Sequence, residues 1–162
     1  MNTNELALKA HLLRRAGFGA SRSELESISD KSYEEIVEDL VHPERFEEID
    51  EDYLKRYNPE LSYHDGHPIH AGRWIWRMIN TKRPLEEKMA LFWHHVFATA
   101  HYKGDHTPST IGQIETFREN GLTNIRQILI DLSKDPHMNY WLDNCENHSD
   151  QPNENWGREL LE

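Results

Sequence analysis

Apolar residues recur every three or four positions along most of this chain, which is the spacing of one helical face. A plain example is the stripe formed by Ile125, Ile128, Leu129 and Leu132. Long segments show this helical period rather than the strict alternation of strands. The pattern predicts helices over residues 4–16, 23–29, 33–41, 68–80, 84–99, 108–120, 125–133, 136–142 and 154–162.

Capping signals fit these boundaries. Ser21 and Ser32 precede predicted helices as N-caps, with a glutamate three residues later, and Asn124 precedes another. Prolines stand at the first position of several helices, where their missing N–H costs nothing. Helices joined by short loops predict an all-α, multi-helix domain with orthogonal or bundle-like packing, formed by residues 1–162.

The end of the chain lacks the signals that close a helix. No Gly or Asn follows the predicted helix 154–162, although its last carbonyls need partners. We therefore expect a domain that is incomplete at its C-terminus and forms the N-terminal part of a longer protein.

Charge narrows the possible classes of function. The chain has 18 Lys and Arg against 29 Asp and Glu, a net charge of -11, which argues against nucleic-acid binding. The acidic run in residues 44–57 is predicted to be a solvated face. No apolar run is long enough to span a membrane. The N-terminus lacks a secretory pattern, so we expect a cytoplasmic protein, or an exported one if a leader is missing.

Several longer motifs, in a fixed order, resemble a known family. They are His11–Gly19, Pro84–Thr99, Phe117-Arg118, Lys134–Pro136, Leu142–Asn144 and Pro152–Glu162. Together they resemble the bacterial "domain of unknown function 1800" family. The resemblance implies no settled activity. It implies a longer protein and, as a partner, a member of the "domain of unknown function 1501" family, whose proteins resemble sulfatases and phosphatases.

The Trp-His motif is the first candidate for chemistry. On the helix 84–99, the predicted buried stripe comprises Leu85, Met89, Phe92, Trp93 and Val96. His94 falls roughly opposite this stripe. It is interpreted either as a structural histidine bonded to a neighbouring helix or as a metal ligand.

If His94 is a metal ligand, further ligands are expected among the residues that follow this helix. A loop that carries His101, Asp105 and His106 beside His94 would supply ligands for a divalent transition metal. The spacing matches no specific metal motif, so an ordinary polar loop is the alternative. Three further histidines lie between Tyr63 and His70, but a proline divides them between loop and helix.

The last twenty residues are the second candidate. Polar residues alternate there with Trp and Leu, and a buried polar group needs a partner. The segment is therefore either a hydrogen-bonded brace between helices or the wall of a site. In the second case the binding residues would be Asn144, Asn153, Glu154, Asn155 and Arg158.

Two classes of function remain open. The chain is either a structural or partner-binding helical module, or a metal-dependent or acid/base hydrolase. The hydrolase would use His94, Asp143 and Glu159 as catalytic residues, and these would have to converge on one pocket.

Overall fold

The computed structural model describes residues 3–62 and 67–162 and confirms an all-α protein. Over these residues the backbone is helical, apart from its connections and an isolated β-bridge between His148 and Gln151. The α-helices are α1 (Thr3–Ala16), α2 (Arg22–Ser27), α3 (Tyr33–Val41), α4 (Asp52–Tyr57), α5 (His67–Asn80), α6 (Pro84–Val96), α7 (His101–Gly104), α8 (Thr107–Asn120), α9 (Ile125–Lys134), α10 (Pro136–Trp141) and α11 (Asn155–Leu161). The short 3-10 helices are η1 (Pro43–Arg45), η2 (Pro59–Ser62) and η3 (Asn144–Glu146).

The predicted N-caps are confirmed. Ser21 accepts a hydrogen bond from the Glu24 N–H, and the Glu24 carboxylate accepts one from the Ser21 N–H. Ser32 makes the same pair of bonds at α3, and the Asn124 side chain caps α9. These ends were predictable because each cap involves groups only three residues apart.

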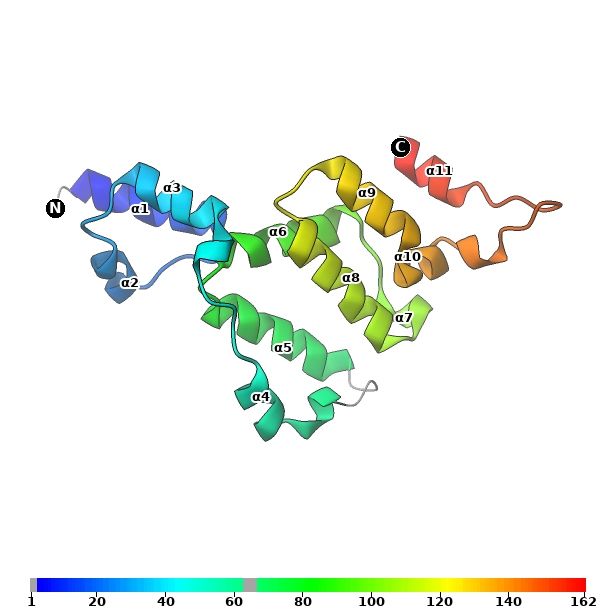
Figure 1. Cartoon of the computed structure of the whole chain (residues 1–162), viewed down its shortest axis with the longest axis horizontal. Helices are drawn as coiled ribbons and strands as arrows, with labels where there is room; N and C mark the ends of the chain where they lie inside the picture. The colour runs from blue at the N-terminus through cyan, green and yellow to red at the C-terminus, as the bar shows by residue number, and fades with distance from the viewer. Residues whose placement is uncertain (1–2, 63–66) are drawn as a thin grey trace.

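The helices are arranged around α6, which runs through the middle of the molecule (Figure 1). Helices α1–α3 form one end, α9–α11 lie at the other, and α5 and α8 pack against α6 between them. The buried core consists of Ala90, Phe117, Ile128, Leu132 and Met138, surrounded by partly buried tryptophans. The centre of the protein is therefore the contact of α6 and α8 with their neighbours.

The predicted buried stripe of α6 is wrong in part. Phe92 and Val96 are each 49% exposed, whereas Glu87 and Ala90 on another face are fully buried. The predicted stripe did not include Glu87, because a carboxylate is expensive to bury without partners. Neighbouring helices supply those partners, so α6 turns a polar face inward. The helix also ends at Val96 rather than at Thr99.

Two other predictions need correction. In the acidic run 44–57 the other carboxylates are exposed as predicted, but Glu51 is only 8% exposed. The expected loop after α6 contains one helical turn, α7, which ends where Asp105 adopts a left-handed backbone with φ of 39°. Within residues 3–62 and 67–162, no helix has the length and apolar character needed to cross a membrane.

Candidate functional site

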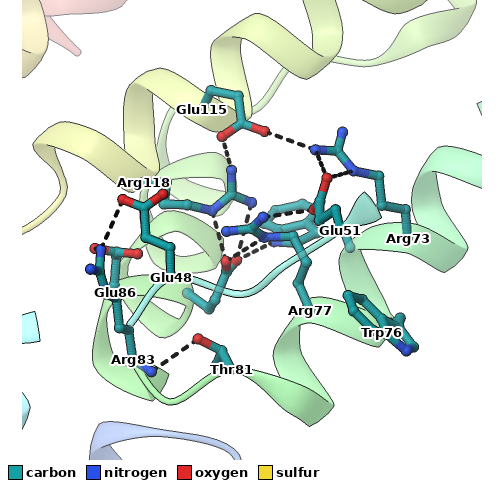
Figure 2. A network of polar contacts seen from close by, with 12 residues as sticks. Glu48, Glu51, Arg73, Trp76, Arg77, Thr81, Arg83, Glu86, Glu115 and Arg118 are labelled. Carbon is teal, nitrogen blue, oxygen red and sulfur yellow. Dashed lines mark hydrogen bonds and ion pairs between the residues drawn. The ribbon is translucent and has the colours of Figure 1, made fainter. Parts of the chain in front are cut away.

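Six charged side chains form what we call the interior ion network, between α4, α5, α6 and α8. Its members are Glu51, Arg73, Arg77, Glu87, Glu115 and Arg118. Figure 2 shows Glu115 in contact with both Arg118 and Arg73, while Arg73 and Arg77 converge on Glu51. Three guanidinium groups thus face three carboxylates, which makes a buried cluster of this size possible.

Glu87 on α6 is the centre of this network. One of its oxygens accepts hydrogen bonds from Arg77 Nε at 2.8 Å and Arg118 Nε at 2.7 Å. The other accepts from Trp74 Nε1 at 2.9 Å and Arg118 Nη2 at 3.2 Å. Burial raises the pKa of Glu87, but the bonds and charges of Arg118 and Arg77 outweigh burial and hold the pKa below its ordinary value. Glu87 is therefore an anion at neutral pH.

Glu51 extends the network to the segment before α4. Its carboxylate lies 2.6 Å from Arg73 Nη2 and accepts a 2.6 Å hydrogen bond from Arg77 Nη1. Burial raises its pKa, and the two arginines lower it further than burial raises it, so the pKa is below the usual value. Because Arg77 contacts both Glu51 and Glu87, it joins the segment before α4 to α6 through α5.

A cavity of about 190 Å³ lies beside the network, between α5, α6 and α8. Its apolar wall comprises Ala71, Trp74, Ile111 and Ile114. Its polar lining comprises His70, Arg73, Arg77, His94, Thr107, Thr110, Glu115 and Arg118. A concave site with an apolar wall and a few convergent polar groups is the usual form of a small-ligand site.

His94 is the predicted site residue that lines this cavity. Its ring makes an edge contact with Trp74 at 5.5 Å between centroids and a tilted contact with Phe117 at 6.5 Å. Its Nδ1 atom is buried and has no hydrogen-bond partner in the described part of the chain. Burial, and secondarily the charge of His137, lowers the pKa of His94, so its imidazole is neutral at pH 7.

The other proposed metal ligands do not line this cavity. His101 Nε2 lies 3.0 Å from Thr107 Oγ1, while Asp105 follows the C-terminus of α7 and His106 is the N-cap residue of α8. Across residues 3–62 and 67–162, no group of three or more His, Cys, Asp or Glu side chains is arranged to hold a metal ion. The histidine run after Tyr63 falls partly on residues 63–66, outside the described residues.

In the part of the chain that the structure describes, His94 and Glu159 border different cavities, and Asp143 lines neither of them. Asp143 has a left-handed backbone with φ of 56°, and its carboxylate pairs with Lys103 at 2.8 Å. Glu159 on α11 pairs with Arg158 at 2.7 Å and borders a second cavity of about 200 Å³. His94 does not line that second cavity.

The polar C-terminal segment forms a hydrogen-bonded brace. Asn155 Nδ2 donates to the Leu142 carbonyl at 3.1 Å, and Asn153 Nδ2 donates to the Asp143 carbonyl at 2.9 Å. Asn144 Nδ2 donates to Asn139 Oδ1 at 2.7 Å. These amide groups fix the chain between α10 and α11.

The remaining predicted binding residues of this segment face solvent. Glu154 is exposed and makes no side-chain cap bond to α11. Arg158 is also exposed, and it pairs with Glu159 and Glu162 on its own helix. Asn153 and Asn155 therefore donate to backbone carbonyls and Asn144 to a side chain, while Arg158 forms surface ion pairs.

A second buried polar chain joins α8 to α10. Thr99 Oγ1 donates to Gln113 Oε1 at 2.6 Å, and Gln113 Nε2 donates to Asp135 Oδ1 at 2.8 Å. The same Asp135 oxygen accepts from the Met138 N–H and so caps α10. Burial raises the pKa of Asp135 despite these bonds. The hydroxyl, the amide and the carboxylate of this chain are thus bonded within the protein, which indicates a structural role.

Sequence analysis missed the arginines of the interior ion network. Arg73 and Arg77 are four residues apart in a predicted helix that is otherwise rich in Trp, Ile and Met. Such a pair on the inward face of an apolar helix indicates a buried acidic partner. That signal was present, but the identity of the partners depends on how α5 packs on α6.

The fold and site define a helical protein with a charged interior, and sequence comparison places it in a family. The sequence model of the family described as Protein of unknown function (DUF1800) matches residues 11–162. The chain belongs to this family, as its motifs suggested. No curated protein and no solved structure matches the chain.

Proposed function

We propose that this chain is a partner-binding helical module that docks another protein at the end formed by α6, α9, α10 and α11. The observation that supports the proposal is an apolar recess of about 200 Å³ between these helices. Its lining includes Val96, Phe97, Leu129, Trp141, Trp156 and Leu160. Apolar side chains left accessible around such a recess are typical of protein interaction surfaces.

Helix α11 gives the recess an exposed apolar edge. Trp156 packs against the core, whereas Leu160 is 50% and Leu161 89% exposed on the following turn. Val96 on the opposite side is 49% exposed. Removal of exposed leucine and valine side chains from water by a partner is favourable. The recess between them can receive an apolar side chain of that partner.

The interior of the protein supports a binding role for this surface. The hydrogen bonds of the interior ion network and those of the Thr99–Gln113–Asp135 chain link helices within the protein. They hold α5, α6, α8 and α10 in place. A rigid scaffold lowers the ordering cost of docking. The partner implied by the family resemblance is a sulfatase- or phosphatase-like protein of the "domain of unknown function 1501" family.

Substitution of Leu160 tests this surface. In titration calorimetry with the member of that second family from the same organism, Leu160→Asp should weaken binding at least about tenfold, because it places a charge in an apolar contact. The matched control is Leu8→Asp on α1, where Leu8 is 58% exposed and lies toward the other end of the molecule. It should bind like the wild type. The proposal fails if the wild-type proteins do not associate, or if both variants weaken binding equally.

The alternative function is a metal-dependent or acid/base hydrolase that uses the Trp-His and Pro-Asn-Glu-Asn motifs. Such a site needs its acid, base and ligands within reach of one substrate atom. The geometry supports it less well, because His94 and Glu159 border different cavities and Asp143 is paired with Lys103.

A further inference from the structure

We propose that the cavity between α5, α6 and α8 binds a small organic carboxylate with a flat apolar body. This binding site is separate from the docking surface proposed above, and either can exist without the other. The proposal rests on the cavity's size, on the charges that line it and on the arginine donors that the interior ion network leaves unused.

The size of the cavity leaves room for a single ring or a short branched chain. A dry protein cavity of about 150 Å³ is large enough to hold benzene. A cavity of about 190 Å³ therefore has room for a ring that carries one carboxylate. Trp74, Ile111 and Ile114 provide the apolar wall against which such a ring would pack.

The charges exposed to the cavity favour an anion. Three arginines of the interior ion network line it, but only one of the three carboxylates, Glu115, does so. Glu51 and Glu87 contact the arginines from outside the lining. The cavity surface is therefore cationic although the network as a whole is balanced, and a ligand with a single negative charge fits this arrangement better than a cation.

The arginines retain donors for a ligand. Arg73 uses Nε and Nη2 on Glu51, and Arg77 uses Nε on Glu87 and Nη1 on Glu51. One terminal nitrogen of each guanidinium thus has no hydrogen bond to any residue that the structure describes. Their glutamate partners hold these guanidinium groups in place, and a fixed pair of N–H donors suits a carboxylate.

His94 provides a further contact. Its ring is held between Trp74 and Phe117, and its buried Nδ1 lacks a partner among the described residues. Nδ1 itself is shielded from solvent, so a ligand would meet the part of the ring that lines the cavity. Because the imidazole is neutral at pH 7, it adds no charge that the network must balance.

Titration with benzoate tests the proposal. We expect saturable chemical-shift changes, including the Trp74 indole signal, with a dissociation constant of about 1 mM or tighter, which is reasonable for so small a ligand. Benzylamine has a similar shape and the opposite charge, and it should bind at least about tenfold more weakly. Inorganic phosphate, which has no apolar body, should also bind at least about tenfold more weakly.

Two substitutions on α5 locate the binding. Ala71 lines the cavity and is exposed, so Ala71→Phe should narrow the cavity without disturbing the core and weaken benzoate binding at least about tenfold. The matched control is Ile75→Phe, one turn further along and 57% exposed, outside the lining. It should leave the affinity unchanged. The proposal is overturned by equal binding of benzylamine, by tighter binding of phosphate, by no saturable change up to about 20 mM benzoate, or by unchanged affinity in folded Ala71→Phe.

Discussion

Glu87→Gln is expected to lower the free energy of unfolding by about 3–5 kcal/mol, because it removes one partner of a buried ion cluster. Arg77 and Arg118 would keep their charges but lose the carboxylate that both contact. The amide would also turn its NH₂ group toward at least one of the donors that now reach Glu87. Urea unfolding followed by tryptophan fluorescence measures the change, since the protein has five tryptophans and Trp74 itself contacts Glu87.

The matched control for this substitution is Glu48→Gln. Glu48 also pairs with an arginine, Arg83, at 3.1 Å, but its side chain is 78% exposed. Exposed ion pairs contribute little, so the expected change is within about 0.5 kcal/mol. If the two substitutions had similar effects, the interior ion network would have no special place in the stability of this protein.

The pH dependence of stability follows from the same carboxylates. The pKa values of Glu87 and Glu51 are lower in the folded protein than the ordinary glutamate value of 4.5. The unfolded chain therefore takes up protons first as the pH falls, and the stabilisation that is present above about pH 4.5 is lost toward each folded pKa. Wild type and Glu87→Gln should accordingly converge in stability as the pH is lowered from about 4.5 toward the folded pKa of Glu87. A constant difference would contradict a charge-based cause.

Local signals predicted the helices of this fold, whereas the interior ion network could not be predicted in the same way. The caps at Ser21, Ser32 and Asn124 depend on groups three residues away, and each was found as expected. Glu87 depends on Arg77 and Arg118, which are 10 and 31 residues distant in the chain. A periodicity argument assigns such a glutamate to solvent, because burial becomes favourable only when other helices bring their charges to it.

In the candidate site too, local features could be predicted from the sequence, whereas contacts between distant residues could not. Sequence analysis singled out His94, and it does line a cavity, but the side chains around it come from α5 and α8 rather than from the predicted metal loop. For the C-terminal segment, sequence analysis left a hydrogen-bonded brace and a ligand site equally open. A brace and a ligand site differ in the hydrogen-bond partners of the amides, and the Asn155 amide donates to the Leu142 carbonyl.

Phe117→Ala is expected to cost about 3–5 kcal/mol, which is the usual effect of deleting a fully buried aromatic ring. Phe117 is 0% exposed, stacks on Phe97 at 6.3 Å between centroids and contacts the His94 ring. Its loss would leave a void between α6 and α8 that the surrounding rings fill only partly. Urea unfolding is again the measurement. The control is Phe92→Ala on α6, where the ring is 49% exposed and contacts Trp93 by its edge, with an expected cost of about 1 kcal/mol or less.

Together, the two large effects separate the charged and the apolar contributions to the same helix contact. Phe117 carries no titratable group, so the stability difference between Phe117→Ala and the wild type should be the same at pH 7 and pH 4. The difference caused by Glu87→Gln should shrink as the pH falls below about 4.5, because the unfolded wild-type chain takes up protons there before the folded protein does. If both differences shrank together, the contact of α6 with α8 would depend on the ion network as a whole. The contribution of Phe117 packing to stability would then depend on that network and would not be independent of it.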